Sequence, residues 1–438
     1  MSASTALLTD RYELTMLDAA LRDGSAHRRC VFELFGRRLS GGRRFGVVAG
    51  QGRLLSLLRD FRFDDAELRF LRDERVVSAE TVRFLEQYRF RGSIEGYREG
   101  ELYFPDSPLL TVEGTFADAV ILETLALSVL NFDSAVATAA ARMSIAAGER
   151  PLAEMGSRRA HEGGAVAAAR AAYIAGFTST SNLEAGRTWG VPTMGTAAHA
   201  WTLLHDTEAD AFRAQLDSLG SDTTLLVDTY DIAEGVRTAV ELGGPNLGGV
   251  RIDSGDLPLV AADVRDQLDR LGNTETQITV TSDLDEYAIA ALAASPVDAY
   301  GVGTSLVTGS GYPTAGLVYK LVARQDGSGA WVSVAKKAQD KGSRGGRKSA
   351  FRRLAGGTAT AEVVRVADGF DAPAVPEVAA DTRPLVVPFV EHGDVDDRHE
   401  GPDGVRAARA HHLAVRAELP VRALALSKSD PAIPTLIG

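Results

Sequence analysis

The fold of this chain is indicated most clearly by the stretch Gly249-Val250-Arg251-Ile252-Asp253-Ser254-Gly255-Asp256-Leu257. A short apolar run ends here in a turn that carries an arginine, a serine and two carboxylates. This pattern predicts a buried strand that delivers polar groups to its carboxyl end. Carboxylates at this place could accept from ribose hydroxyls or hold Mg²⁺ through water, and Arg251 offers a planar fork for a carboxylate or phosphate. The alternative is a structural Arg–Asp pair that caps the next helix.

The same pattern recurs from about residue 150, with roughly 15 to 30 residues between strand ends. The apolar runs are residues 151–156, 175–180, 191–196, 225–228, 249–253, 278–283 and 299–303. Successive βα units imply a parallel sheet with helices outside. A doubly wound sheet gathers its ligand groups at one switch point, whereas here nearly every strand end is polar. We therefore expect an α/β fold with an irregular (β/α) barrel whose C-terminal face holds the active site.

The segments on either side of the barrel predict a smaller α+β domain. A helix should begin after Thr9-Asp10, and residues 30–35 and 109–114 alternate like strands. Residues 118–147 predict one or two buried helices, with Asn131-Phe132-Asp133 as the candidate break. The expected domains are 1–117, 118–321 and 322–438, the last packing back on the first.

Composition excludes several classes of protein. The 438 residues allow one to three domains, and 45% hydrophobic with 24% charged residues is typical of a globular protein rather than a membrane or disordered one. A net charge of -12 argues against a broad grip on nucleic acid. The single cysteine, Cys30, excludes an intrachain disulfide, and the N-terminal residues lack a signal-peptide pattern. We expect a cytoplasmic protein without membrane or nucleic-acid partners.

Other strand ends carry further candidate groups. Gly301-Val302-Gly303-Thr304-Ser305 could cradle a phosphate, although short glycine-rich turns are common. Arg158 and Arg159 follow a strand, as does Asp283, and they could bind a substrate or serve only in ion pairs and caps. His199 lies near the start of a helix among small residues; it is either a packing residue or a nucleophile with room for something bulky to approach.

Positive charge is concentrated in one glycine-rich stretch of this acidic chain. Its cations include Lys336, Lys337, Lys341, Arg347 and Lys348. We expect a loop that closes over polyphosphate, the alternative being a merely solvated loop.

Six motifs, in this order, resemble those of the nicotinate phosphoribosyltransferase family. They are residues 9–16, 156–161, 195–199, 251–256, 301–305 and 316–321, so the similarity runs from about Thr9 to Arg353. The resemblance implies a type II phosphoribosyltransferase fold, usually as a homodimer. It also implies conversion of nicotinate and phosphoribosyl pyrophosphate to nicotinate mononucleotide and pyrophosphate, with Mg²⁺ and with ATP hydrolysis coupled through a phosphohistidine.

The resemblance also assigns roles to residues of this chain. Tyr12 would line the nicotinate ring, Thr196 and Arg251 would meet the nicotinate site, and His199 would be phosphorylated. Gly303 and Thr304 would hold the ribose 5-phosphate, and Arg158 would lie between pyridine and phosphate groups. Asp253 would face ribose or metal. The strand-end acids Asp256, as a metal ligand through water, and Asp283, in substrate binding, complete the predicted site.

Related activities remain as alternatives. Quinolinate phosphoribosyltransferase should be much shorter, whereas nicotinamide phosphoribosyltransferase is a closer relative. The latter uses an aspartate to recognise the amide at a position that matches Ser181 or Asn182 here, and a neutral residue there avoids repelling a carboxylate. A non-catalytic nucleotide-binding barrel would explain the glycine-rich turn but not His199 together with the two strand-end acidic motifs.

Overall fold

The computed structural model describes residues 4–335, 344–367 and 381–438, and the chain divides into two compact units. The α/β unit is Ala139–Gly311, and the α+β unit combines Met1–Thr138 with Tyr312–Gly438. The sequence predicted boundaries at 117/118 and 321/322. The two units instead meet at 138/139, within the long helix Glu123–Ala147, and at 311/312, because the first turns of that helix and the strand Leu317–Gln325 pack with the α+β unit.

The α/β unit is built on a curled, parallel six-stranded sheet, which confirms the predicted βα repeats. Its strand order is β7-β6-β11-β10-β9-β8, so the first strand of the unit lies beside the last, as in a barrel. An isolated bridge between Thr180 of β7 and Thr193 extends the sheet at its β7 edge. Among the described residues the ring stays open between Thr193 and β8. The strands are β6 (Leu152–Glu154), β7 (Ser179–Thr180), β8 (Thr224–Leu226), β9 (Gly249–Ile252), β10 (Gln277–Val280) and β11 (Ala299–Val302).

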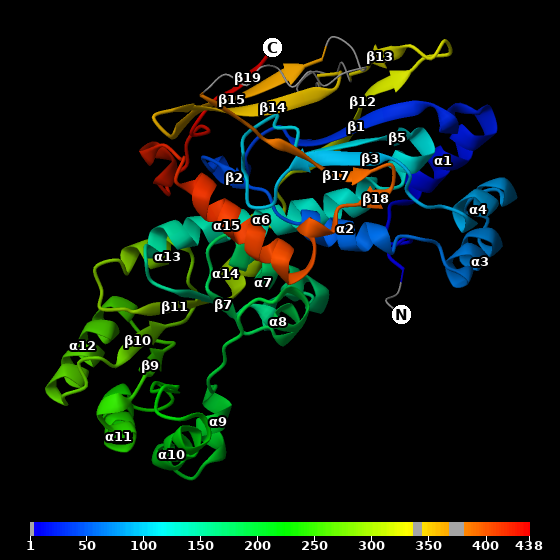
Figure 1. Ribbon diagram of the computed structural model, residues 1–438. Coiled ribbons are helices and arrows are strands. Elements are labelled where there is room, and N and C mark those ends of the chain that lie inside the picture. Colours follow the sequence, from blue (N-terminus) through cyan, green and yellow to red (C-terminus); the bar gives the residue numbers. More distant parts are fainter. Residues whose placement is uncertain (1–3, 336–343, 368–380) are drawn as a thin grey trace. The chain divides into compact units, whose positions relative to one another are not determined.

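Helices follow each strand, as Figure 1 shows for α11 and α12 beside β9 and β10. Several begin at residues whose side chains accept hydrogen bonds from backbone amides of the first turn. Asp231 accepts from the Glu234 amide, and Asp285 accepts from the Tyr287 and Ala288 amides. The helices of this unit are α7 (Glu162–Ile174), α8 (Leu183–Trp189), α9 (His199–Leu204), α10 (Glu208–Leu219), α11 (Ile232–Gly243), α12 (Leu257–Arg270), α13 (Glu286–Ala291) and α14 (Thr304–Val307), with 3-10 turns η3 (Ser157–Arg159) and η4 (Gly244–Asn246).

The α+β unit is built on a seven-stranded sheet in the order β13-β12-β1-β5-β3-β17-β18. Strands from late in the chain flank β1, β5 and β3 on both sides, so the two ends of the sequence form one core. The strands are β1 (Arg29–Gly36), β3 (Ser93–Tyr97), β5 (Leu110–Thr115), β12 (Leu317–Gln325), β13 (Trp331–Ser333), β17 (Val386–Glu391) and β18 (Asp394–Val395).

A four-stranded sheet, a two-stranded pair and several helices complete this unit. The strands are β2 (Gly46–Val47), β4 (Leu102–Tyr103), β14 (Lys348–Ala355), β15 (Thr358–Val366), β16 (Thr382–Pro384) and β19 (Thr435–Ile437). The helices are α1 (Arg11–Asp23), α2 (Gln51–Arg59), α3 (Asp65–Asp73), α4 (Ala79–Glu86), α5 (Phe116–Val120), α6 (Glu123–Ala147, which continues into the other unit) and α15 (Gly401–Arg416), with 3-10 turns η1 (Ser25–His27), η2 (Ser40–Gly42), η5 (Asp397–His399) and η6 (Val421–Leu424).

The long apolar helix α6 corrects one prediction. The chain turns after α5, and α6 then runs unbroken through residues 131–133, the expected break. Asn131 accepts from the Leu317 amide at 2.8 Å and Asp133 pairs with Arg53 at 2.9 Å, so both polar residues are satisfied without leaving the helix. The segment Phe116–Ala147 has the length and composition of a membrane span, but 67% of its apolar window is buried inside the protein.

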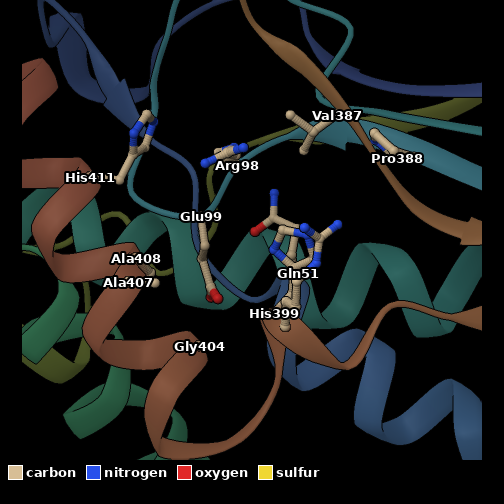
Figure 2. Close-up of a pocket in the computed structure, with 11 residues that line it drawn as sticks. Gln51, Arg98, Glu99, Val387, Pro388, His399, Gly404, Ala407, Ala408 and His411 are labelled. Carbon is tan, nitrogen blue, oxygen red and sulfur yellow. The ribbon is translucent and has the colours of Figure 1, made fainter.

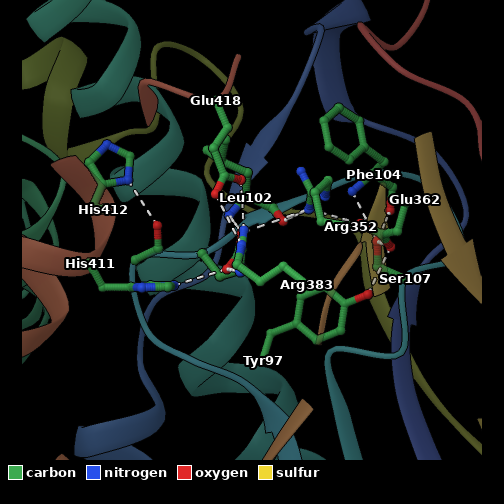
Figure 3. A network of polar contacts seen from close by, with 12 residues as sticks. Tyr97, Leu102, Phe104, Ser107, Arg352, Glu362, Arg383, His411, His412 and Glu418 are labelled. Carbon is green, nitrogen blue, oxygen red and sulfur yellow. Dashed lines mark hydrogen bonds and ion pairs between the residues drawn. The ribbon is translucent and has the colours of Figure 1, made fainter. Parts of the chain in front are cut away.

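A buried network of charges joins distant segments of the α+β unit (Figure 3). Glu101 bonds His411 at 2.9 Å and Arg383 at 2.8 Å, and Arg352 bonds Glu362 at 3.0 Å. Burial alone would raise the pKa of Glu101, but its cationic partners outweigh that effect and hold the pKa well below its usual range. The network therefore ties α15, β14 and β16 to the turn before β4.

Candidate active site

Polar side chains converge at the carboxyl ends of the parallel strands, and Asp228, just after β8, is the centre of this cluster. Only 1% of its side chain is exposed. One of its oxygens lies 3.1 Å from His199 Nε2, and the other accepts from the Asp253 amide at 2.9 Å and from Ser254 Oγ at 2.7 Å. One carboxylate therefore joins the loops after β8 and β9 to the start of α9.

Arg251 of β9 points its guanidinium at the loop before α9. Its Nη1 donates to Thr196 Oγ1 at 2.8 Å and its Nη2 donates to the Ala197 carbonyl at 3.0 Å. The Nε group is buried and has no hydrogen-bond partner among the residues that the structure describes. Burial lowers the pKa of Arg251; the carboxylates of Asp253 and Asp228 oppose this effect, and nearby Arg158 adds to it. A bound anion would relieve both the unpaired donor and the repulsion between the two arginines.

The predicted acids occupy different environments. Asp253 accepts from Thr281 Oγ1 at 2.5 Å, which fixes one oxygen and orients the carboxylate. Asp256 and Asp283 are exposed. The part of the chain that the structure describes contains no group of three or more His, Cys, Asp or Glu side chains arranged for a metal ion.

His199 and His161 both follow predicted strands, and their surroundings in the structure differ. His199 begins α9, is partly exposed and bonds the buried Asp228. His161 is largely exposed, and its Nδ1 accepts from the Gly163 amide at 3.3 Å as the N-cap of α7. The structure therefore gives His199 an orienting carboxylate and His161 a capping role.

Residues near β6 and β7 frame the same edge of the sheet. Asn182 caps α8 by accepting from the Ala185 amide at 2.9 Å and donates to Ser157 Oγ at 3.0 Å, so its amide is engaged on both sides. Ser181 beside it is exposed. Arg158 is exposed on η3 near Arg251, and Gly303 and Thr304 lie where β11 passes into α14.

The remaining predicted residues belong to the α+β unit. Tyr12 is partly exposed on α1, and partial burial together with the Glu123 carboxylate raises the pKa of its hydroxyl. Lys336, Lys337 and Lys341 lie outside the described residues.

The prediction of a phosphate-closing loop is wrong for Lys348 and is not supported for Arg347. Lys348 lies on β14, is 4% exposed and bonds both oxygens of Glu33 at 2.8 and 2.9 Å. Arg347 pairs with Glu95 and Glu113 at 2.9 and 2.7 Å. Carboxylates on strands of the seven-stranded sheet have therefore already neutralised both cations.

Two residues of the site were not selected from the sequence. Asp228 ends an apolar run in the same way as Asp253, so the strand-end signal was present but was not applied to it. Glu154 at the end of β6 is fully buried and bonds Thr180 Oγ1 and the Gly156 amide. Burial raises the pKa of Glu154. An acid that ends an apolar strand was its only sequence signal.

Comparisons with known proteins agree with one another. The model of the nicotinate phosphoribosyltransferase (NAPRTase) N-terminal domain matches residues 7–131. Nicotinate phosphoribosyltransferase pncB1 of Mycobacterium tuberculosis is 55% identical over 98% of this chain and 94% of its own length. The crystal structure of human nicotinic acid phosphoribosyltransferase has a TM-score of 0.82 at 26% identity, covering 98% of this chain and 97% of its own. Nicotinate-nucleotide pyrophosphorylase from Pyrococcus furiosus, at 24% identity, shares the fold with a TM-score of 0.76 over 94% of this chain and 96% of its own.

Proposed function

We propose that this chain, which belongs to the nicotinate phosphoribosyltransferase family, transfers a phosphoribosyl group to nicotinate in NAD salvage and couples the transfer to ATP hydrolysis through a phosphohistidine. Nicotinate attacks the anomeric carbon of phosphoribosyl pyrophosphate. The new C–N bond gives nicotinate mononucleotide, and the C–O bond that breaks releases pyrophosphate.

The hydrogen bonding of Arg251 is the observation that favours nicotinate over nicotinamide as the substrate. Its two Nη groups are held by Thr196 and Ala197, and its Nε donor is left without a partner. A substrate carboxylate supplies the missing acceptor and a counter-charge, whereas a neutral amide supplies less. Ser181 and Asn182 are neutral and would not repel that carboxylate, and Tyr12 is assigned to the nicotinate ring by its motif.

No general base is needed for the transfer. The pyridine nitrogen of nicotinate is unprotonated at neutral pH, so the site must align the reactants and stabilise an oxocarbenium-like state. Asp253, whose carboxylate accepts from Thr281 Oγ1, would accept from ribose hydroxyls. Gly303 and Thr304 would hold the 5-phosphate, with Arg158 near the departing charge.

The phosphohistidine step is assigned to His199. When its Nε2–H donates to Asp228, Nδ1 keeps its lone pair and can attack the γ-phosphorus of ATP, breaking the bond to the β-phosphate oxygen and releasing ADP. Asp228 steadies the positive charge that develops on the ring. Hydrolysis of the N–P bond later returns the free imidazole and inorganic phosphate.

The acids at the strand ends could hold Mg²⁺ together with water and substrate phosphates. Mg²⁺ prefers oxygen ligands and binds through one or two carboxylates, water and substrate phosphates, which Asp253, Asp256 and Asp283 could provide without a protein cage. When bound, the ion neutralises the charge of the leaving pyrophosphate. We further propose a cytoplasmic homodimer.

The test uses purified protein, phosphoribosyl pyrophosphate and Mg²⁺, with nicotinate or nicotinamide, each with and without ATP. We expect nicotinate mononucleotide, with ADP formed in step with it and a strong preference for nicotinate. Equal use of nicotinamide would overturn the substrate assignment. The absence of product from either pyridine would instead favour a nucleotide-binding protein without catalysis.

A further inference from the structure

A cavity with a volume of about 240 Å³ lies wholly within the α+β unit (Figure 2). Its walls come from α2, the β3–β4 turn, β17, η5 and α15. The polar residues that line it are Gln51, Arg98, Glu99, Arg398, His399 and His411. The proposed transfer reaction uses none of them.

Gln51 is the strongest sign that this cavity has an occupant. It is 1% exposed, and its Nε2 donates to the Tyr97 carbonyl at 3.1 Å. That bond fixes the orientation of the amide, and among the described residues the buried Oε1 of this cavity-lining side chain has no hydrogen-bond partner. A buried acceptor without a partner costs roughly 1–3 kcal/mol, so the cavity should receive a ligand that brings an N–H or O–H group.

Cationic and imidazole groups also line the cavity. Figure 2 shows Arg98 and His411 in the upper part of the view, above the Gln51 amide and the Glu99 carboxylate. Arg398 is already paired with Asp396, through its Nε at 3.0 Å and its Nη2 at 2.6 Å, so Arg98 is the cation that we assign to the anion. Burial lowers the pKa of His399, so this ring can donate one N–H while staying neutral. These groups suit an oxyanion, and the planar guanidinium of Arg98 matches a phosphate.

Glu99 limits what the anion can be. Its carboxylate accepts from the Gly50 amide at 2.5 Å and the Gly52 amide at 3.3 Å, at the start of α2. A bare polyanion filling the cavity would lie against this negative charge and the Gln51 oxygen. A ligand with an anionic group at one end and hydroxyl groups at the other matches both sides.

We propose that this cavity binds a phosphate monoester that carries free hydroxyl groups, of about the size of a triose or pentose phosphate. Arg98 and His411 bind the phosphate, and the Gln51 Oε1 and Glu99 side accepts from the hydroxyls. His411 also bonds Glu101 of the buried charge network at 2.9 Å, so that wall is anchored before the ligand arrives.

Isothermal titration calorimetry with the full chain tests this proposal, using glycerol 3-phosphate as the probe. No nicotinate or ATP is present, so the result does not depend on the proposed transfer reaction. Methyl phosphate has no hydroxyl and glycerol has no phosphate, and we expect each to bind at least about fivefold more weakly than the probe. Because the probe could also enter the transferase site, variants assign the binding.

Arg98→Ala should weaken the cavity's binding by about tenfold or more. Gln51→Met, which keeps the volume but removes the acceptor, should abolish the preference for glycerol 3-phosphate over methyl phosphate. Arg69→Ala, at an exposed arginine of α3, is the matched control and should leave binding unchanged. Thermal unfolding of each variant checks that it is folded.

Two results would overturn the proposal. Binding that is identical in the parent and in Arg98→Ala would place the probe elsewhere. No detectable binding in the parent up to about 10 mM would mean that the cavity holds only water.

Discussion

Replacing Arg251 by alanine tests the proposed recognition of nicotinate most directly. The guanidinium is held by bonds of 2.8 Å to Thr196 and 3.0 Å to the Ala197 carbonyl, so it is positioned before the substrate arrives. A charge-assisted bond to a carboxylate contributes about 1.5–3 kcal/mol, which corresponds to about 10- to 150-fold in kcat/KM. We expect Arg251→Ala to lower kcat/KM for nicotinate by about a hundredfold and that for nicotinamide by much less.

The conservative variant and a surface control refine this test. Arg251→Lys keeps the charge but cannot bond Thr196 and Ala197 together, so we expect an intermediate loss of about tenfold. Arg237→Ala removes an exposed arginine paired with Glu234 and should leave kcat/KM unchanged for both substrates. Steady-state rates with both pyridines, together with the melting temperature, give the comparison. An equal loss with nicotinate and nicotinamide, or a loss of nicotinate kcat/KM below about threefold, would refute the reasoning.

Three further outcomes are expected. Incubation with γ-labelled ATP should give an acid-labile, base-stable label that is absent from His199→Asn and forms at least about tenfold more slowly in Asp228→Asn. A label that persists in His199→Asn would mean that another residue is phosphorylated, with His161 the next candidate. Lys348→Met should lower the free energy of unfolding by about 3–5 kcal/mol in urea titrations, because it leaves Glu33 buried and unpaired. Arg213→Met, in an exposed ion pair, should lower it by at most about 1 kcal/mol, and equal losses in the two variants would contradict the prediction. Burial lowers the pKa of His412 to about 4, below its unfolded value, so the neutral ring stabilises the protein fully above pH 6.5. The free energy of unfolding should therefore fall by about 3 kcal/mol as the pH falls from 6.5 towards 4, and this dependence on pH should be smaller in His412→Gln.

Much of the α/β unit could be predicted from sequence because its signals are local. Each strand is an apolar run that ends in a polar residue, and parallel strands bring their carboxyl ends to one edge whatever the loops between them do. Arg251 and Asp253 were found in this way, whereas Thr196 came from the family resemblance and His199 from its small neighbours and the same resemblance. The same rule would have found Asp228, because it too follows an apolar run.

The α+β unit could not be predicted in the same detail because its contacts join residues far apart in sequence. Lys348 was grouped with the loop cations, but its strand pairing places it against Glu33, 315 residues away. Asn131 and Asp133 suggested a helix break, but partners elsewhere in the unit satisfy both side chains.

The sequence by itself determined the βα order, the polar strand ends and the family resemblance, because these depend on residue type and spacing along the chain. Only the tertiary structure decided which charges neutralise one another and which polar atoms stay unpaired. The unpaired Nε of Arg251 and Oε1 of Gln51 are visible only there. The burial and the hydrogen-bond partners of a side chain are set when distant segments pack together, so they cannot be predicted from the local spacing of residues.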